Sequence, residues 1–179
     1  IRVFFTAFES LEVDWALLFA GIAAASMTIG NLVAIAQTNV KRMLAYSTIA
    51  HAGYMLVGLA AVASRTVDGV SIGSETLLFY LGGYAVTNLA AFFAIMAIME
   101  RTRSELIESF AGMSQRAPWL ALALSIALLS LTGIPPTVGF MAKLFVFGAA
   151  IKADLAWLVA LGAVNSVISA YFYLRVIRV

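Results

Sequence analysis

Residues 125–151, SIALLSLTGIPPTVGFMAKLFVFGAAI, form an apolar run in which Lys143 is the one charged side chain, and the sequence Gly-Ile-Pro-Pro interrupts the run at residues 133–136. Two consecutive prolines remove backbone donors and push the preceding residue out of helical geometry, so the run predicts a broken helix. Peptide groups freed at membrane depth are tolerated only where protein or a polar cavity surrounds them. A charge at the bilayer centre costs at least ~2.5 kcal/mol and usually faces a bundle interior or a water-filled path. We therefore expect this segment to handle ions.

The composition indicates the class of protein. Of the 179 residues, 63% are hydrophobic and only 11% are charged, whereas a soluble domain carries roughly 25% charged residues. Together with a mean hydropathy of +1.01, this predicts an all-α integral membrane protein. The absence of cysteine excludes disulfides, thiolate metal sites and cysteine nucleophiles. The net charge of +2 does not indicate a nucleic-acid partner, because most basic residues lie in short segments between apolar runs.

Five apolar runs are long enough to cross a bilayer at about 20 residues per span. They are residues 15–37, 43–64, 76–99, 118–151 and 155–174. Residues 1–8 are typical of the tail of a helix whose beginning is missing. We therefore expect five transmembrane helices plus the tail of a sixth, in a single membrane-embedded domain that covers residues 1–179 and is a fragment of a longer protein.

The fourth run is longer than one membrane span. Its 34 residues would measure ~51 Å as a straight helix, so we expect the break at residues 133–136 to kink or offset its halves.

The preceding residues 100–116 mix both signs of charge. Apolar residues recur there at steps of three and four, which predicts a short helix at the membrane interface; they are Leu106, Ile107, Phe110 and Met113.

The basic residues predict the orientation. If each run crosses once, seven basic residues fall on one side, which we place in the cytoplasm, and two on the other. The seven are Lys41, Arg42, Arg101, Arg103, Arg116, Arg175 and Arg178. A re-entrant hairpin at residues 118–151 would change the count to six against three, so the crossing arrangement is favoured. The last run ends in an aromatic and basic stretch, with Tyr171 and Tyr173, that is typical of an interface.

Two side chains within the runs are candidates for proton transfer. Lys143 lies seven residues after Pro136, about two helical turns past the break. Removal from water disfavours the charged form of an amine, so a sheltered lysine can gain or lose a proton as neighbouring charge changes. The alternative is a lysine that extends to the interface. His51 has an imidazole suited to proton transfer, with a neutral histidine bonded between helices as the alternative.

Other polar residues in the runs have a simpler interpretation. Hydroxyl and amide groups could line a hydrated path, but hydrogen bonding between helices is favoured for each of them. These residues are Thr28, Asn31, Tyr46, Ser47, Tyr54, Asn165 and Ser169.

Two stretches carry a family resemblance. Residues 39–60, NVKRMLAYSTIAHAGYMLVGLA, and residues 129–147, LSLTGIPPTVGFMAKLFVF, resemble the antiporter-like subunits of respiratory complex I. Within that family the resemblance is to the subunit N branch of NADH-quinone oxidoreductase and its chloroplast counterpart, subunit 2. It implies that the chain corresponds to helices 9–13 of a fourteen-helix subunit. Lys143 resembles the lysine of the family's broken twelfth helix, a proposed proton-channel residue, and His51 resembles a histidine of the tenth.

The resemblance implies a proton-translocating membrane subunit of an NADH-quinone oxidoreductase, a translocase subunit without redox chemistry of its own. It further implies no cofactor or metal bound by this chain, with quinone, flavin and iron-sulfur clusters in partner subunits. The partners would be other membrane-arm subunits, the lipid bilayer and protons, with no nucleic acid. The location would be the plasma membrane as a multi-pass protein, or the thylakoid membrane in a photosynthetic source.

Two alternatives remain at this point. The chain could belong to a cation/proton antiporter or a membrane-bound hydrogenase of the same architecture. It could also be a structural membrane spacer, which would leave the broken helix and Lys143 unexplained.

Overall fold

The computed structural model describes residues 14–64 and 72–179. The predicted helix tail at residues 1–8 lies outside the described residues, as does most of the loop that follows the second run. The described elements are all helical: α2 (Trp15–Ile35), α3 (Val40–Ala63), α4 (Ile72–Thr102), the 3₁₀ turn η1 (Ile107–Phe110), α5 (Met113–Arg116), α6 (Pro118–Thr132), α7 (Val138–Lys152) and α8 (Ala156–Arg178). The prediction of an all-α protein is therefore confirmed for this part of the chain.

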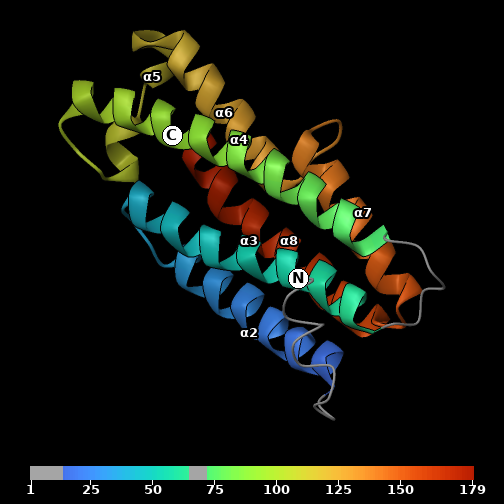
Figure 1. Ribbon diagram of the computed structural model, residues 1–179. Helices are drawn as coiled ribbons and strands as arrows, with labels where there is room; N and C mark the ends of the chain where they lie inside the picture. The colour runs from blue at the N-terminus through green and yellow to red at the C-terminus, as the bar shows by residue number, and fades with distance from the viewer. Residues whose placement is uncertain (1–13, 65–71) are drawn as a thin grey trace.

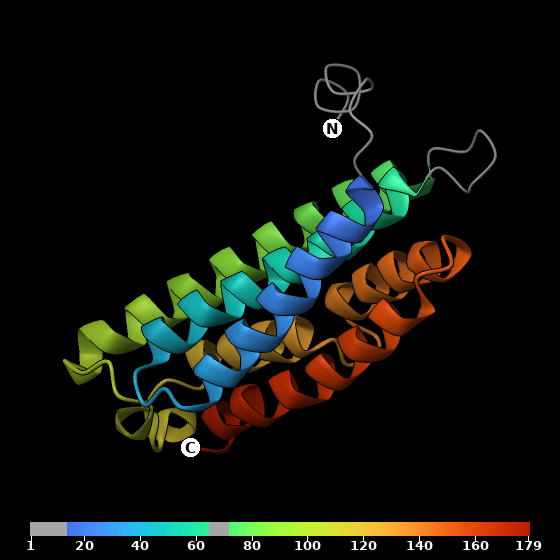
Figure 2. The ribbon, with the colours of Figure 1, turned by 90° about the horizontal axis from the view of Figure 1, so that it is seen from below.

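The helices form a bundle around α3, which packs against α2, α4, α7 and α8 (Figure 1). Within the described residues, four helices are long and apolar enough to cross a membrane by themselves, namely α2, α3, α4 from Ser74 onward, and α8. The fourth predicted span is two helices of 15 residues each, α6 and α7, which confirms the predicted break at residues 133–136. These two lie end to end beside α4 in both views, an arrangement that differs from a hairpin (Figures 1 and 2).

Capping groups explain why several boundaries differ from the predicted ones. The Asn39 side chain accepts hydrogen bonds from the amides of Lys41 and Arg42, at 2.9 and 3.1 Å, so α3 begins at Val40 rather than at residue 43. At the start of α2 the Asp14 carboxylate accepts a hydrogen bond from the Leu17 amide. The helices α4 and α8 extend beyond the apolar runs, to Thr102 and Arg178, because charged residues continue a helix that the apolar residues have started.

The predicted interfacial helix within residues 100–116 is confirmed only in part. Its apolar residues Ile107, Phe110 and Met113 are buried, but Leu106 is exposed. The segment forms two short turns instead of one helix, because Gly112 between them has φ +72° and so leaves the right-handed helical region.

Most basic residues of the described ranges lie at one end of the bundle, whereas Lys152 closes α7 at the other end. The turn between α2 and α3, the segment between α4 and α6, and the C-terminus all lie there, while the turn between α7 and α8 lies at the other end (Figure 2). At the basic end Arg175 donates to the backbone oxygens of Ile35 and Gln37, which close α2. Basic side chains are therefore concentrated at one end of the bundle, and the cytoplasmic position of that end stays a prediction.

The same end carries an ion pair that ties the α2–α3 turn to the segment after α4. Glu105 accepts hydrogen bonds from Lys41 Nζ at 2.8 Å and from Asn39 Nδ2 at 2.7 Å. The backbone amide of Ile107 donates to the Thr38 carbonyl oxygen beside it. The hydrogen bonds from Lys41 and Asn39 lower the pKa of the Glu105 carboxyl below its ordinary value.

We expect E105Q to speed hydrogen exchange at the Ile107 amide about twofold at neutral pH, since the ion pair is solvent-exposed and such pairs contribute little. Because the pKa of Glu105 is lowered in the folded protein, its stabilisation exists above the ordinary carboxyl pKa and disappears as the pH falls through the lowered value. Exchange of the variant and the wild type, followed by mass spectrometry, should therefore converge in acid. E108Q, at an exposed carboxylate on the same segment, serves as the control.

Buried apolar side chains form two clusters that meet at the middle of the bundle. One includes Met43, Ile95 and Leu128 and lies toward the basic end. The other includes Met27, Val146 and Leu158 and lies toward the opposite end. The helix break and most of the buried polar residues lie between the two clusters, so the fold shelters polar groups at its centre.

Candidate functional site

The break between α6 and α7 exposes two backbone carbonyl groups. Helix α6 ends where Gly133 adopts φ +88°, a left-handed conformation that glycine tolerates. The Gly133 amide donates to the carbonyl oxygens of Leu129 and Ser130. The Thr137 hydroxyl then accepts the Phe140 amide and begins α7. The carbonyls of Leu131 and Thr132 are thereby left without partners from the helix backbone.

Lys143 satisfies these two carbonyls. Its Nζ donates to the Thr132 oxygen at 2.8 Å and to the Leu131 oxygen at 3.4 Å. The side chain is only 6% exposed, and it turns back to the break instead of extending to the interface. A cation at this position also faces the negative end of the α6 helix dipole. Among the residues that the structure describes, no carboxylate forms an ion pair with the buried Lys143 ammonium.

Glycine residues let the two half-helices approach each other. A Cβ on Gly133 would lie 3.1 Å from Lys143 Cδ and 3.4 Å from its Nζ. A Cβ on Gly139 would overlap the Ser130 carbonyl oxygen, and the Gly139 amide donates to Ser130 Oγ at 3.3 Å. The sequence at the break therefore makes room for the lysine side chain and joins the two halves.

His51 lies on α3 with both ring nitrogens in hydrogen bonds to tyrosines. Nδ1 is 2.8 Å from the Tyr80 hydroxyl of α4, and Nε2 is 3.2 Å from the Tyr173 hydroxyl of α8. The Tyr173 hydroxyl is also hydrogen-bonded to Ser47. The imidazole stacks on Tyr84 with a centroid separation of 4.8 Å. His51 therefore lies within a row of hydrogen bonds from Tyr80 through Tyr173 to Ser47. In each of these bonds either partner could be the donor.

The Tyr54 ring lies near both candidate residues. The Lys143 ammonium sits 4.8 Å from the centroid of the Tyr54 ring. The centroid of the same ring is 5.8 Å from that of His51, one turn earlier on α3. One buried aromatic ring, that of Tyr54, therefore contacts both His51 and Lys143.

Other polar residues bond between helices, as predicted for most of them. The Asn31 Nδ2 donates to Asn165 Oδ1 at 3.1 Å and joins α2 to α8, while Asn165 also donates to Thr28. Ser47 bonds to Tyr173 across α3 and α8. Ser169 differs from the prediction, because its hydroxyl donates to the Ser166 carbonyl of its own helix.

A cavity of about 10 Å³ lies between His51 and the helix break, which is about the space that one water molecule needs. His51 and Tyr84 line one side, and Thr87, Ser130 and Leu131 line another. The Thr87 hydroxyl donates to the Gly83 carbonyl and is 3.4 Å from Ser130 Oγ. The imidazole of His51 and the residues at the end of α6 therefore border the same small cavity.

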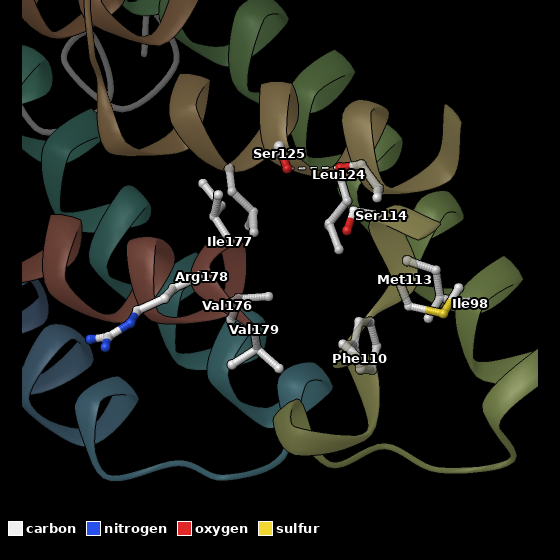
Figure 3. Close-up of a pocket in the computed structure, with 12 residues that line it drawn as sticks. Ile98, Phe110, Met113, Ser114, Leu124, Ser125, Val176, Ile177, Arg178 and Val179 are labelled. Atoms are coloured by element: carbon white, nitrogen blue, oxygen red, sulfur yellow. Dashed lines mark hydrogen bonds between the residues drawn. The ribbon is translucent and has the colours of Figure 1, made fainter. Parts of the chain in front are cut away.

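A larger cavity of about 140 Å³ lies near the basic end of the bundle, away from the break. Figure 3 shows mainly apolar side chains around it, with the Arg178 guanidinium directed away and the Ser125 hydroxyl bonded to its own helix. Among the residues that the structure describes, no three His, Asp or Glu side chains are placed to hold a metal ion.

Sequence reasoning missed the tyrosines that surround His51. The sequence predicts an interfacial position for Tyr173, but this residue is fully buried because α8 continues through Arg178 and packs its tyrosine inside the bundle. Tyr80 is also buried and was given no role. A signal was available, because Tyr173 follows Ser169 by one turn and Ser166 by two, which places polar groups along one face of the helix.

Comparison with known proteins gives a consistent result. Residues 1–169 match the family model described as NADH:quinone oxidoreductase/Mrp antiporter, transmembrane. The chain is 52% identical to NADH-quinone oxidoreductase subunit N of Dehalococcoides mccartyi, over 100% of this chain and 37% of the relative. It is 46% identical to NAD(P)H-quinone oxidoreductase subunit 2 of Rippkaea orientalis, over 99% of this chain and 33% of the relative. The chain thus spans about a third of the length of these curated relatives.

Solved structures show the same likeness. A chain of respiratory complex I from Thermus thermophilus matches 89% of this chain and 34% of its own length, with 34% identity and a TM-score of 0.72. A chain of the Mrp complex from Dietzia sp. matches 90% of this chain and 29% of its own length, with 27% identity and a TM-score of 0.80. The predicted resemblance to antiporter-like membrane subunits is confirmed.

Proposed function

Because the chain belongs to the NADH:quinone oxidoreductase/Mrp antiporter transmembrane family, we propose that it is part of a proton-translocating membrane subunit of an NADH-quinone oxidoreductase. Lys143 and His51 transfer the protons in this proposal. The observation that carries it is the Lys143 ammonium, which is buried at a helix break and bonded to two carbonyl oxygens without a carboxylate among the described residues. The protein would reside in a plasma membrane, or in a thylakoid membrane of a photosynthetic source.

In this proposal α6 and α7 together cross the membrane, and the break provides the proton-binding position. The charged Lys143 is held by the Leu131 and Thr132 carbonyls and by the negative end of α6. The neutral amine loses most of that electrostatic attraction, so its side chain is freer to leave the carbonyls. A change of charge elsewhere in the subunit could then shift the balance between the two states.

His51 supplies the other side of the route. One ring nitrogen donates and the other accepts, so a proton that enters on one side can leave from the other as the tautomer changes. The imidazole lies close to the break, because His51, Ser130 and Leu131 line one small cavity. Electron transfer, flavin, iron-sulfur clusters and quinone would belong to partner subunits of the membrane-bound enzyme.

The proposal is tested with the assembled complex that contains the full-length subunit. In sealed vesicles, NADH-driven quinone reduction should move protons into or out of the lumen, read by a pH-sensitive dye. The absence of proton movement during rapid quinone reduction would contradict the proposal.

We expect H51Q to lower the rate of proton translocation per NADH oxidised by about fivefold, because an amide can bond to Tyr80 and Tyr173 but cannot take up a proton at neutral pH. Subunit content, measured by immunoblotting, should be unchanged. The control is Y84F, which keeps the ring stacked on His51 and removes only a hydroxyl that bonds to Thr48. Equal translocation by H51Q and Y84F would remove His51 from the route.

A second candidate is a subunit of a cation/proton antiporter, and the similarity to the Mrp complex favours it. This reading predicts cation-dependent proton movement driven by an imposed ion gradient, without NADH or quinone. The same vesicles can decide between the two by comparing NADH with a sodium gradient as the driving force. A membrane-bound hydrogenase of the same architecture would instead require a hydrogen-oxidising partner.

A further inference from the structure

We propose that the aromatic ring of Tyr54 is a positioning residue that holds the charged Lys143 side chain at the helix break, in the place where a buried cation would otherwise need a carboxylate. This inference deepens the proposed function, and it rests on Lys143 being the proton-transfer group. It assigns to Tyr54 a task that differs from the hydrogen bonding between helices predicted from its sequence position.

The first step is the lack of an anion next to the ammonium. Within the described ranges Lys143 forms no ion pair, and its two hydrogen bonds go to the neutral carbonyls of Leu131 and Thr132. Its Nζ lies 4.8 Å from the centroid of the Tyr54 ring, inside the roughly 6 Å range in which a ring face attracts a cation. Such attraction is stronger at a buried site, and the Lys143 side chain is buried.

The second step is that the ring is fixed. Tyr54 is 1% exposed, and its hydroxyl donates to the Gly162 carbonyl oxygen at 3.4 Å and accepts from Ser166 at 3.2 Å. The Phe147 ring packs against it with a centroid separation of 6.1 Å. A Cβ on Gly162 would lie 2.8 Å from Phe147 and 3.7 Å from Tyr54, so the glycine leaves room for both rings. A ring fixed in this way can position the ammonium without moving with it.

The third step concerns the strength of the contact. A carboxylate in this buried site would form an ion pair whose disruption is strongly unfavourable, so the amine would hold its proton more tightly. A neutral ring attracts the cation less strongly, so it stabilises the charged state and still allows the proton to leave. The Tyr54 ring can therefore hold the charged Lys143 in place and still let Lys143 release its proton.

Several titratable side chains face this region and share its pH dependence. These side chains are His51 on α3, Tyr80 and Tyr84 on α4, and Tyr173 on α8. The spans Trp15–Ile35 and Pro118–Thr132 contribute no Asp, Glu, His, Lys, Arg or Tyr. The test must therefore vary the ring without altering the charge of any of these groups.

Substitution of residue 54 by phenylalanine and by its mono-, di- and trifluorinated forms meets that condition. Fluorine withdraws electrons from the ring face and changes its shape little. In the assembled complex with the full-length subunit, Y54F should keep the alkaline limb of the pH profile of proton translocation close to that of the wild type. Each added fluorine should move this limb further to lower pH. The trifluorinated form should differ from Y54F by about one pH unit, a tenfold change in proton affinity that corresponds to about 1.4 kcal/mol.

Y54L removes the ring face and should give a shift of similar size. F110L is the matched control, because Phe110 is a buried aromatic residue of the other apolar cluster. Should Y54L fail to assemble, the fluorinated series still decides the question. An unmoved pH profile across the whole series would overturn the role of Tyr54.

A K143Q complex tells this failure apart from failure of the proposed function. If K143Q loses translocation while the fluorinated series has no effect, only the inference about Tyr54 is wrong. If K143Q translocates like the wild type, the proposed function of Lys143 fails, and the positioning role fails with it.

Discussion

Replacing Lys143 with glutamine is expected to lower the proton translocation of the assembled complex at least tenfold, with the subunit still in place. A glutamine amide can donate to the Leu131 and Thr132 carbonyls, as the ammonium does, but it cannot take up and release a proton. Proton transfer by a positioned group typically contributes a factor of about 10²–10⁴, so a tenfold fall allows for a slow bypass through water. The measurement is lumen acidification per NADH oxidised.

Two further variants separate chemistry from structure. K143A also removes the donor and leaves two buried carbonyls unsatisfied, at a cost of about 1–3 kcal/mol for a buried polar group. We therefore expect K143A to lower the thermal stability of the complex, and K143Q to change it less. K152Q, at an exposed lysine on the same helix, should match the wild type in both assays. Undiminished translocation by K143Q would show that proton transfer does not require Lys143 at the helix break.

The sequence alone predicts the parts of the site that depend on local rules. Consecutive prolines with a preceding glycine predict the break, and a lysine within an apolar run predicts a sheltered charge. The long apolar runs predict the helices, because a membrane leaves the backbone few other ways to satisfy its hydrogen bonds. These inferences need no knowledge of which helices are neighbours.

The contacts of the site depend on packing between distant segments, which periodicity does not specify. Nothing local places Tyr173 against His51, since the two residues are 122 positions apart. The same holds for Tyr54 and Lys143, which meet only because α7 packs against α3. The sequence also does not predict that Lys143 bonds to the carbonyl groups at the end of α6. The direction of the lysine side chain depends on the space left at Gly133.

Gly139 is the position at which the smallest substitution should have the largest structural effect. In G139A the added Cβ would overlap the Ser130 carbonyl oxygen, which belongs to the backbone of α6 and cannot rotate away as a side chain can. Overpacking typically costs about 1–3 kcal/mol, and a backbone contact places this variant at the upper end. We expect most of the subunit to be lost from the purified complex.

The matched control is G148A, on the same helix and with nothing within 4 Å of its added Cβ. Alanine is the better helix former by about 0.5–1 kcal/mol, so G148A should assemble at least as well as the wild type. Any G139A complex that does assemble should translocate protons poorly, because Lys143 lies one turn after Gly139 and moves with it away from the Thr132 carbonyl. Normal assembly and normal translocation in G139A would mean that the contact between α6 and α7 does not fix the position of the lysine.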